Sequence, residues 1–413
     1  MTSSETTLAL FTPQVIRERA QTLLALAEQG KLVHVEVDPE GLADVLVSVL
    51  ETTMENYPDL QIPPYGVWRD FEAGGIDRWG ALAGARGFES AEEMLAATAD
   101  LAVLGTMLKT MRPEGWIFED PMTATRVSGR QASALAAFHM FASGSFSSQM
   151  SDPYRVDAET LIRLELEELA SGLQWDREAD ADLLDAMQRQ LKRFGEALAL
   201  RPDLFADGDE TRPGLLATGL AKDCGGAVEA GTVLDRLLEA LAPVWEGGAQ
   251  AGDILLGDSF RHKGLPGSEL EQTVPFHLAA QEMVYALVEP FAWAGLEVSG
   301  LEDLSAPADD RHAALFLSKG VLKLTSDGSD LSAEAALERM IEVRAAASAL
   351  TDRLAGLLRA ELNVPAEQLP LTCILEGGTS RTGSDFLSRE TGEAEKLGKI
   401  LNPGSVFWLP FGA

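Results

Sequence analysis

The sequence predicts a mainly α-helical protein of the α+β class, with small β-sheet elements attached to a large helical domain. Three observations support this fold class. Apolar residues recur at helical spacing over long segments, whereas β-like runs are short and few. The chain has 413 residues, of which 46% are hydrophobic, so it is long enough to bury a sizeable core.

The helical pattern is clearest from about 333 to 363, where Asn363 and the proline two positions later are expected to end the helix. Four leucines form an apolar stripe there at i, i+4, i+7 and i+8: Leu350, Leu354, Leu357 and Leu358. Ser90 and Glu93 form a capping box before another helix, and the run 178–200 is expected to stop at Arg201 and Pro202. The other helices are expected over 13–29, 40–57, 129–143, 157–172, 230–243 and 271–294.

The β-like runs are short stretches rich in branched and aromatic residues. They are expected at 32–37, at 115–119 with 124–127 after a turn, and at 253–256, 314–324, 371–375 and 406–409.

The polar segment 201–214 is rich in Pro, Gly and charged residues. It is either a linker between two lobes, 1–205 and 214–413, or one surface loop, and short polar loops are the more frequent. We therefore expect a single large helical domain over 1–413, with the two lobes as the alternative. Self-similarity with a period of 20 to 50 residues, the mark of a solenoid, is not visible.

The charge balance argues against two classes of partner. With 33 Lys and Arg against 65 Asp and Glu, the formal net charge is −32, which repels nucleic acids and anionic membrane surfaces. The start of the sequence lacks the pattern of a signal peptide, and no stretch of about 18 apolar residues occurs, so we expect a cytoplasmic protein. Cys224 and Cys373 are too few for a disulfide framework.

The stretch WRDFEAGGIDRW, residues 68–79, concentrates charged and aromatic groups around a Gly pair. In a binding site, Arg69 and Arg78 would bind a carboxylate or phosphate, Trp68 would stack on a planar ring, and Glu72 would hold a polar atom. Alternatively, Arg69 pairs with Glu72 and Arg78 with Asp77 or Glu72, while the tryptophans hold the loop. Taken alone, this structural interpretation is favoured, because ion-paired Arg and buried Trp are common.

The stretch LTCILEGGTSRTGSDFL, residues 371–387, is expected to be a strand, a Gly-rich loop and a helix. Backbone N–H groups, Thr379, Ser380 and Arg381 would then cradle an anion at the helix N-terminus. The terminal Lys of a P-loop is absent, and an ordinary strand-to-helix turn is an equal alternative.

A third pattern lies in the helix expected over 271–294. His277, Gln281, Tyr285 and Glu289 recur every four residues along one edge. The edge can line a pocket, with Glu289 as an acid or base tuned by burial and Gln281 binding an amide. Alternatively, it borders solvent, or His277 caps a neighbouring backbone.

The stretch LGDSFRHKG, residues 256–264, follows a predicted strand. Asp258 stands where α/β-type proteins often present a catalytic carboxylate. With His262 it can also bind a divalent metal, although no second cluster of ligands is present, and we expect no metal and no cofactor. The remaining histidines are single and expected to be structural: His34, His139 and His312.

Several blocks, in this order along nearly the whole chain, resemble the uracil-catabolism protein 4 family, a fungal and bacterial helper of pyrimidine breakdown. They are ENYPDLQIP with WRDFEAGGIDRW, FASGSFSS, LGDSF, VPFH...Q...Y.L.EP...AGLEV, and ILEGGT. The resemblance implies that the protein acts beside a uracil phosphoribosyltransferase and a cyclohydrolase-like protein. In that route, the ring is opened while attached to ribose phosphate, and the ribosylurea-type product is cut into urea and a sugar phosphate.

The chain departs from the family pattern at four positions, where it carries Tyr65, Asp70, Leu278 and Glu282. The first two stand where His is expected, and the last two replace Lys and Trp. Arg311, in the segment RHAAL, fits an Arg of the family's R-N-G-G segment. The resemblance therefore implies a divergent member, and Asp70 is the first residue to consider for a change of substrate.

Residues and resemblance together predict a hydrolase of an N-glycosidic or ureido C–N bond in an anionic, pyrimidine-derived ribosyl compound. Asp258 first and Glu289 second are the expected catalytic carboxylates, which would orient and deprotonate water. The alternatives are a non-catalytic binding protein for a labile intermediate and a metal-dependent amidohydrolase-like enzyme; a homo-oligomer is left open. The expected substrate-binding residues are Trp68, Arg69, Glu72, Arg78, His277, Gln281, Tyr285, Arg311, Glu376, Thr379 and Arg381.

Overall fold

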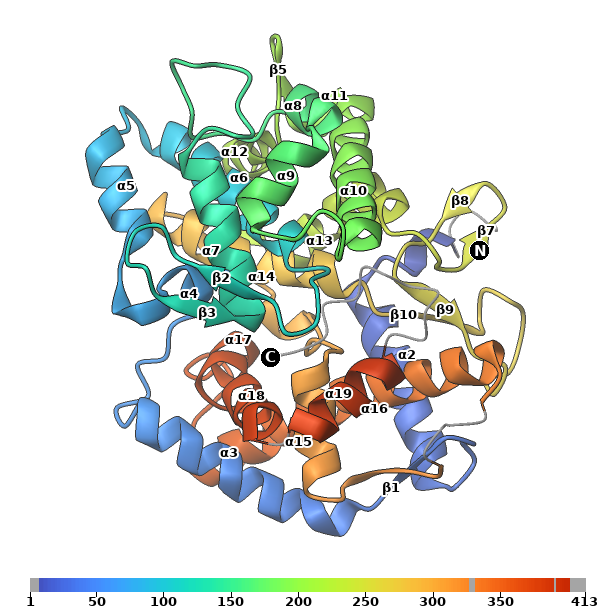
Figure 1. Ribbon diagram of the computed structural model, residues 1–413. Helices are drawn as coiled ribbons and strands as arrows, with labels where there is room; N and C mark the ends of the chain where they lie inside the picture. Colours follow the sequence, from blue (N-terminus) through green and yellow to red (C-terminus); the bar gives the residue numbers. More distant parts are fainter. Residues whose placement is uncertain (1–6, 327–330, 390, 402–413) are drawn as a thin grey trace. The chain divides into compact units, whose positions relative to one another are not determined.

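The computed structural model describes residues 7–326, 331–389 and 391–401. Helices dominate these residues, and the sheets they form are two-stranded, which confirms the predicted mainly α class (Figure 1). The strand predicted at 406–409 lies outside the described residues.

The chain divides into two compact units, each built from stretches that are separate in sequence. Unit 1 comprises Met1–Tyr65, Glu246–Gln281 and Gly300–Ala413, and unit 2 comprises Gly66–Trp245 and Glu282–Ser299. Segment 201–214 lies within unit 2. Helix α14 (Leu278–Trp293) begins in unit 1 and ends in unit 2.

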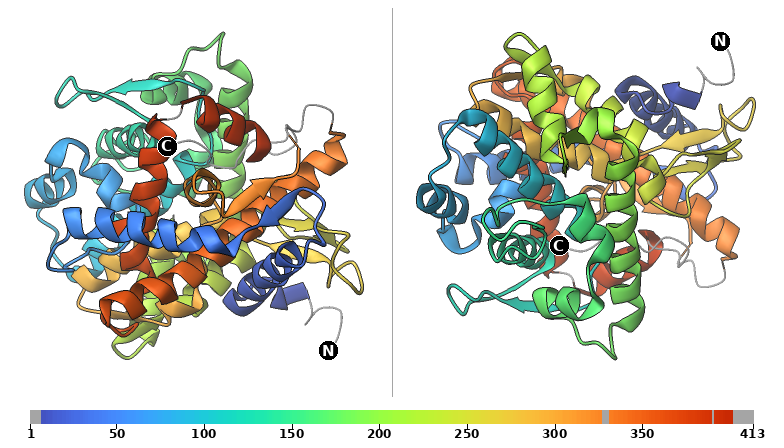
Figure 2. Two further views of the ribbon diagram at one scale, coloured as in Figure 1. Left: turned by 90° about the horizontal axis from the view of Figure 1, so that it is seen from below. Right: turned by 90° about the horizontal axis from the view of Figure 1, so that it is seen from above.

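Unit 1 is built on the long helix α16 (Ala333–Leu362), which packs beside α2 (Pro13–Glu28) (Figures 1 and 2). Asn363 ends α16 in the left-handed conformation, at φ 54°, which confirms the predicted end. The other described helices of unit 1 are η1 (Pro39–Gly41), α3 (Leu42–Asn56), η4 (Leu301–Asp303), α15 (Asp310–Ser318), α17 (Leu371–Ile374), the π-helix η5 (Leu375–Thr379), α18 (Ser380–Arg389) and α19 (Thr391–Leu401).

The strands that the structure describes in unit 1 form three antiparallel pairs. Strand β1 (Val35–Val37) pairs with β12 (Leu322–Leu324), β7 (Gln250–Ala251) with β8 (Ile254–Leu255), and β9 (Ser259–Arg261) with β10 (Thr273–Pro275).

Unit 2 has α6 (Ala91–Leu108) and α7 (Gly129–Ala142) at its core. Leu95–Leu108 and much of α7 are buried, and their many Ala side chains let other helices approach. The remaining helices are α4 (Val67–Phe71), η2 (Ala73–Gly75), α5 (Arg78–Arg86), α8 (Ala158–Arg163), α9 (Leu166–Leu173), α10 (Ala181–Leu200), α11 (Pro202–Phe205), α12 (Gly214–Asp223), α13 (Ala230–Leu241) and η3 (Ala242–Val244).

The sheets of unit 2 include the predicted hairpin, β2 (Ile117–Glu119) with β3 (Arg126–Ser128). A second hairpin joins β4 (Ala206–Asp207) to β5 (Glu210–Thr211), and β6 (Ala227–Glu229) pairs in parallel with β11 (Glu297–Ser299).

Two strand predictions need correction. Residues 371–375 are helical, and the run 314–324 begins in α15 and only its end forms β12. Residues 371–375 and the start of the second run, 314–317, are short apolar stretches, and such stretches fit a buried helix as well as a strand.

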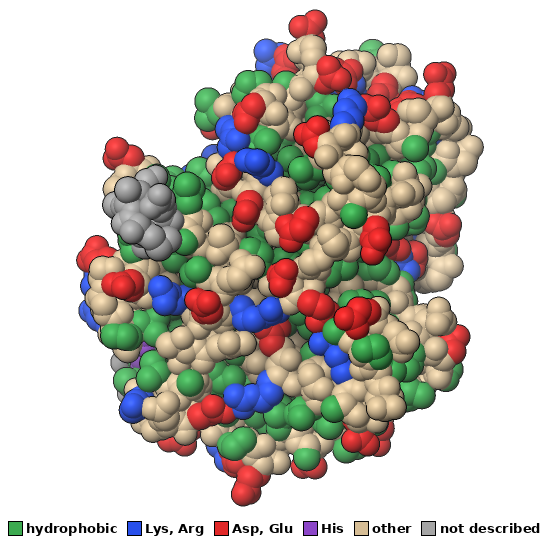
Figure 3. Space-filling view, turned by 180° about the vertical axis from the view of Figure 1, so that it is seen from behind, with side chains coloured by type: hydrophobic (Ala, Val, Ile, Leu, Met, Phe, Trp, Pro, Cys, Tyr) green, Lys and Arg blue, Asp and Glu red, His purple; other side chains and the backbone are tan. Residues whose placement is uncertain are grey.

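Among the described residues, the helices are too short or too polar to span a membrane. On the face that Figure 3 shows, Lys and Arg side chains lie singly or in small groups among carboxylates.

Candidate functional site

In unit 2, Trp68 of the WRDF block is held by the backbone of α14. Its ring is 2% exposed, and Nε1 donates a hydrogen bond of 2.7 Å to the carbonyl of Ala286. In an unbroken helix, this carbonyl would accept from the residue four positions later, but that residue is Pro290, which has no N–H. The indole of Trp68 therefore satisfies a carbonyl that Pro290 leaves unpaired.

Gly66 allows this close approach of α4 to α14. A Cβ atom at position 66 would lie 3.2 Å from Cα of Ala286 and 3.3 Å from the carbonyl oxygen of Tyr285. A side chain at this position would require the backbone of α14 to shift by a few tenths of an ångström.

The next residue, Arg69, contacts Glu289, which directly precedes Pro290. Its Nη2 lies 2.8 Å and 3.1 Å from the two carboxylate oxygens of Glu289, and 3.2 Å from the carboxylate of Glu72. Two predicted groups that are 220 residues apart in sequence thus meet. Solvent reaches this group, because the side chains of Arg69, Glu72 and Glu289 are 21%, 43% and 14% exposed.

Aromatic rings surround Trp68. Phe71, Trp79 and Trp293 have ring centroids 5.4, 5.9 and 4.7 Å from that of Trp68, in edge-to-face arrangements. Trp293 is 39% exposed, whereas Trp68 and Trp79 are buried. The buried tryptophans hold the block in place, as the structural interpretation expected.

Arg78 is buried and does not pair within its own stretch. It forms an ion pair of 2.6 Å with Asp120 and donates to the carbonyls of Phe71 and Ala73, while Asp77 caps α5 through the backbone N–H of Gly80. The predicted pairing of Arg78 with Asp77 or Glu72 is therefore wrong.

The pKa of Asp120 reflects this pairing. Burial favours the neutral acid, but hydrogen bonds from Arg78, Thr123, His139 and the backbone of Met122 outweigh burial, and the pKa lies below its ordinary value. Arg78 and an ionised Asp120 thus fix the Gly pair of the block against hairpin β2–β3.

A second group of charges lies deeper in unit 2. Lys109, which is 1% exposed, has its Nζ 3.5 Å from Asp70 and 3.3 Å from Glu282, and Arg130 lies 3.2 Å from Glu282 and 3.9 Å from Asp70. The two carboxylates are departures from the family pattern, and they share the same two cations. We call Asp70, Lys109, Arg130 and Glu282 the buried charge cluster.

Sequence reasoning missed both cations of this cluster. Lys109 directly follows the long apolar run of α6, and Arg130 begins the apolar helix α7. A charge beside a buried run needs a partner, and this was the available signal.

In unit 1, Asp258 is 1% exposed, and Arg344 binds both its carboxylate oxygens, at 2.7 and 2.8 Å. The same carboxylate accepts from the backbone N–H of Leu278 and so caps the start of α14. Arg344 also lies over the ring of Phe276, 4.1 Å from its centroid. These contacts are those of a structural carboxylate, because they occupy the oxygens that would orient a water molecule.

His277 and Gln281 also have buried partners in unit 1. Nε2 of His277 lies 3.1 Å from the carbonyl of Leu10, and burial lowers the pKa of His277 to about 4, so its ring is neutral near pH 7. Gln281 donates to the carbonyl of Phe276 and accepts from the backbone N–H of Ser305. Tyr285, in unit 2, is fully buried.

Asp258 and His262, the two residues considered as metal ligands, each bind another side chain, Arg344 and Glu342 respectively. His262 accepts from the backbone N–H of Gly264 at Nδ1, so Nε2 carries the proton and donates to Glu342 at 3.2 Å. Over the described part of the chain, no group of three or more His, Cys, Asp or Glu side chains is arranged to hold a metal ion.

The EGGT stretch is not a loop. Residues 371–389 run as α17, the π-helix η5 and α18, so the predicted strand and helix N-terminus are wrong. Gly378 packs on α3, where a Cβ atom would lie 2.6 Å from Oγ1 of Thr53. The Gly pair serves helix packing here, in place of the predicted loop before a helix N-terminus.

Arg381 and Glu376 pair one turn apart on this helical segment. Nη2 of Arg381 lies 2.7 Å from Glu376 and 3.0 Å from the hydroxyl of Tyr57. Nε of Arg381 donates to the carbonyl of Glu376, so three contacts hold the guanidinium.

Thr379 and Arg311 belong to another buried chain of hydrogen bonds in unit 1. Arg311 contacts the hydroxyl of Tyr65 at 2.6 Å and the carboxylate of Asp309 at 2.5 Å. Asp309 also holds Nδ1 of His312 at 2.6 Å, and Nε2 of His312 lies 3.1 Å from Oγ1 of Thr379. Sequence reasoning missed Asp309 and took His312 as an isolated structural residue.

The predicted site residues thus fall into separate groups. Trp68, Arg69, Glu72 and Glu289 meet in unit 2, and the last three are partly open to solvent. In unit 1, Arg311 with Thr379, Glu376 with Arg381, and Asp258 each have their own partners.

Comparison with known proteins identifies the family of this chain. A family model described as a protein of unknown function (DUF1688) matches residues 9–397. The chain is 28% identical over 390 residues to "Protein urg3" of Schizosaccharomyces pombe, covering 92% of this chain and 94% of that protein. It is 25% identical over 342 residues to "Uracil catabolism protein 4" of Lachancea kluyveri, covering 76% of this chain and 75% of that protein. Because the family model covers nearly its whole length, the chain belongs to the DUF1688 family.

Proposed function

We propose that this protein acts in uracil catabolism and hydrolyses a C–N bond, N-glycosidic or ureido, of an anionic, pyrimidine-derived ribosyl compound. The role in uracil catabolism is supported by the name of the similar Lachancea kluyveri protein. The reaction class is supported by the resemblance of the sequence blocks and by the chemistry of the Arg69 group.

The contact between Arg69 and Glu289 carries the proposal. It joins a guanidinium, which binds phosphate or carboxylate well, to a carboxylate of the kind that orients water or stabilises an oxocarbenium-like centre. Both side chains are partly exposed. Nε of Arg69 is buried and has no acceptor among the described residues, so the exposed part of the guanidinium is what a substrate would meet.

In the proposed reaction, Arg69 binds the anionic end of the substrate and Glu289 orients and deprotonates a water molecule. The water oxygen attacks the carbon of the C–N bond, the bond breaks, and the departing nitrogen takes a proton. For a ribosylurea phosphate, the products are urea and a sugar phosphate. Hydrolysis needs no oxidant or reductant.

The contacts of the two candidate carboxylates favour Glu289 over Asp258 in this role. Asp258 is 1% exposed, and Arg344 and the N–H of Leu278 occupy its oxygens, whereas Glu289 is 14% exposed. In the proposal, Asp258 keeps α14 in place.

The test is incubation of the purified protein with ribosylurea phosphate and related ureides, with urea and sugar phosphate measured by mass spectrometry. We expect turnover by the wild type, a loss of about 100-fold or more in Glu289→Gln, and little change in Glu239→Gln, whose carboxylate pairs with Arg236 at an exposed place in unit 2. Ligand-induced thermal stabilisation without turnover would support the binding-protein alternative and overturn the hydrolase proposal.

A further inference from the structure

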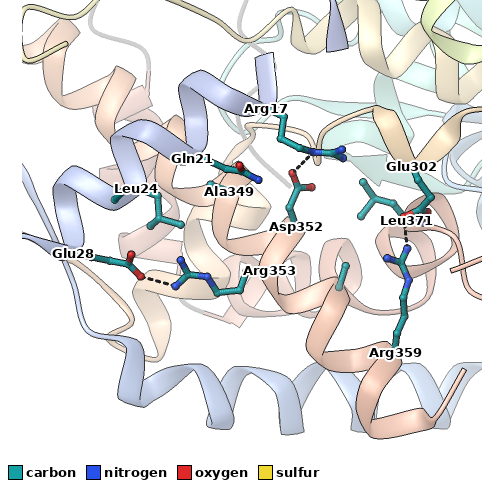
Figure 4. A pocket seen from close by; sticks show the side chains of 12 residues that line it. Arg17, Gln21, Leu24, Glu28, Glu302, Ala349, Asp352, Arg353, Arg359 and Leu371 are labelled. Atoms are coloured by element: carbon teal, nitrogen blue, oxygen red, sulfur yellow. Dashed lines mark hydrogen bonds and ion pairs between the residues drawn. The ribbon is translucent and has the colours of Figure 1, made fainter. Parts of the chain in front are cut away.

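A cavity in unit 1 lies outside every group described above. Its volume is about 460 Å³, within the range of small-molecule sites. It is bounded by α2, η4, α16 and the start of α17 (Figure 4). Its polar lining residues are Arg17, Gln21, Glu28, Glu302, Asp352, Arg353 and Arg359.

Fixed acceptors hold two guanidiniums at the wall of this cavity. Arg17 donates from Nε to Asp352 at 3.0 Å and from Nη2 to the carbonyl of Leu304 at 2.6 Å. Arg359 donates from Nε to the carbonyl of Leu369 at 2.8 Å and from Nη2 to Glu302 at 2.7 Å. Figure 4 shows the two ion pairs side by side along the cavity. Both guanidiniums are thus oriented before any ligand arrives.

Two carboxylates of the cavity, those of Asp352 and Glu302, each accept two hydrogen bonds, whereas two of its guanidiniums keep donors; the third ion pair joins Glu28 to Arg353. Asp352 accepts from Arg17 and from the N–H of Ala306, and Glu302 accepts from Arg359 and from the N–H of Leu371. Nη1 of Arg17 and Nη1 of Arg359, in contrast, have no hydrogen-bond partner among the described residues. Arg17 and Arg359 therefore keep donors for a ligand in the cavity.

The lining of the cavity carries as many carboxylates as guanidiniums: Glu28, Glu302 and Asp352 against Arg17, Arg353 and Arg359. Burial raises the pKa of Asp352 above its ordinary value, although Arg17 and the backbone of Ala306 oppose this. A less acidic Asp352 neutralises Arg17 less completely as the pH falls.

We propose that this cavity is a binding site for a small organic anion, a carboxylate or a phosphate monoester, held by Arg17 and Arg359. Two pre-oriented guanidiniums with free N–H groups suit the planar, paired oxygens of a carboxylate or the oxygens of a phosphate. The site is independent of the proposed hydrolase reaction, since it contains none of the Arg69, Glu72 and Glu289 group.

The test is isothermal titration calorimetry of the full chain with two probes, inorganic phosphate and succinate. We expect saturable binding of at least one probe, and the probe that binds identifies the chemical class. Arg359→Gln removes a donor and should weaken binding about tenfold or more. Arg236→Gln, at an exposed ion pair of unit 2, is the matched control and should bind as the wild type does.

A second variant keeps the ion pairs and fills the space. Gln21 lines the cavity, so Gln21→Trp should abolish binding, whereas Thr22→Trp, at the exposed neighbouring position, should not. Persistence of binding in Arg69→Gln is expected, because that variant alters only the proposed hydrolase site. Absence of saturable binding of both probes by folded wild type, or unchanged binding in both Arg359→Gln and Gln21→Trp, would overturn the proposal. Neither result depends on whether urea is released.

Discussion

The indole Nε1 of Trp68 donates to the carbonyl of Ala286, which Pro290 leaves without its helical partner. The contact connects the first residue of the WRDF block to the part of α14 that precedes Pro290. It also explains why Arg69 and Glu289 meet, because Arg69 follows Trp68 and Glu289 precedes Pro290 in the chain.

Trp68→Phe should lower the free energy of unfolding by about 1–3 kcal/mol, because it leaves a buried carbonyl unpaired. Pro290→Ala restores an N–H for that carbonyl, so Trp68→Phe should cost less in a Pro290→Ala background. Urea denaturation of the four proteins of this double-mutant cycle measures the coupling. Equal costs in both backgrounds would show that the hydrogen bond is not what Trp68 contributes.

Asp258→Asn should destabilise the protein by about 3–5 kcal/mol, because it leaves the fully buried Arg344 without its counter-charge. Asp38→Asn, at an exposed pair with Lys323, should change the melting temperature little. Thermal melts and turnover should be measured on the same samples. A stable Asp258→Asn variant without turnover would instead identify Asp258 as the catalytic carboxylate.

The protein should lose stability as the pH falls from about 6.5 to 4, in part through His277. Burial lowers its pKa to about 4 in the folded state, against 6.5 as the ordinary value. In this pH window, the unfolded chain binds the proton and the folded protein does not, so acid favours unfolding, by about 3 kcal/mol at most.

His277→Gln removes this titration. Urea denaturation at pH 7, 6 and 5 should therefore show a smaller loss of stability in the variant than in the wild type. The same pH dependence in both proteins would mean that His277 does not contribute to it.

Gly378→Ala should destabilise unit 1 by about 1–3 kcal/mol, because the added carbon would lie 2.6 Å from Oγ1 of Thr53 and 2.7 Å from Cγ1 of Val49. Gly356→Ala, in α16 with open space around it, should instead stabilise by up to about 1 kcal/mol. Chemical denaturation of both variants checks the contrast. Were Gly378 in a flexible loop, Gly378→Ala would be tolerated.

The sequence predicts the helices well where their ends carry a local signal. Asn363 ends α16, and Ser90 accepts from the backbone N–H of Glu93 at the start of α6, as expected. The error at 371–375 has a physical cause, since two glycines after a short apolar run fit a loop as well as close helix packing. The loop and the close helix packing can be distinguished only from the position of α3, against which Gly378 packs.

The sequence could not predict how the candidate groups pair. Arg69 and Glu289 were both predicted site residues, but their contact depends on the carbonyl of Ala286, which Pro290 leaves free and which lies 218 residues from Trp68 along the chain. Lys109 and Asp309 carry no motif. Their importance lies in partners that only the tertiary structure brings near, such as Glu282 for Lys109 and Arg311 for Asp309.

The order in which the chain is made has a consequence for unit 1. Strand β1 pairs Val35 with Leu324, and α2 packs on α16, so the first segment of this unit meets its partners only after most of the chain has left the ribosome. At about 5–20 residues per second, the delay between Val35 and Leu324 is roughly 15–60 s. During that time, Ile16, Leu23 and Leu24, which are buried in the folded protein, remain uncovered. Unit 2 lacks only Glu282–Ser299 once Trp245 has been made. The apolar face of α2 therefore stays exposed during synthesis until α16 has been made.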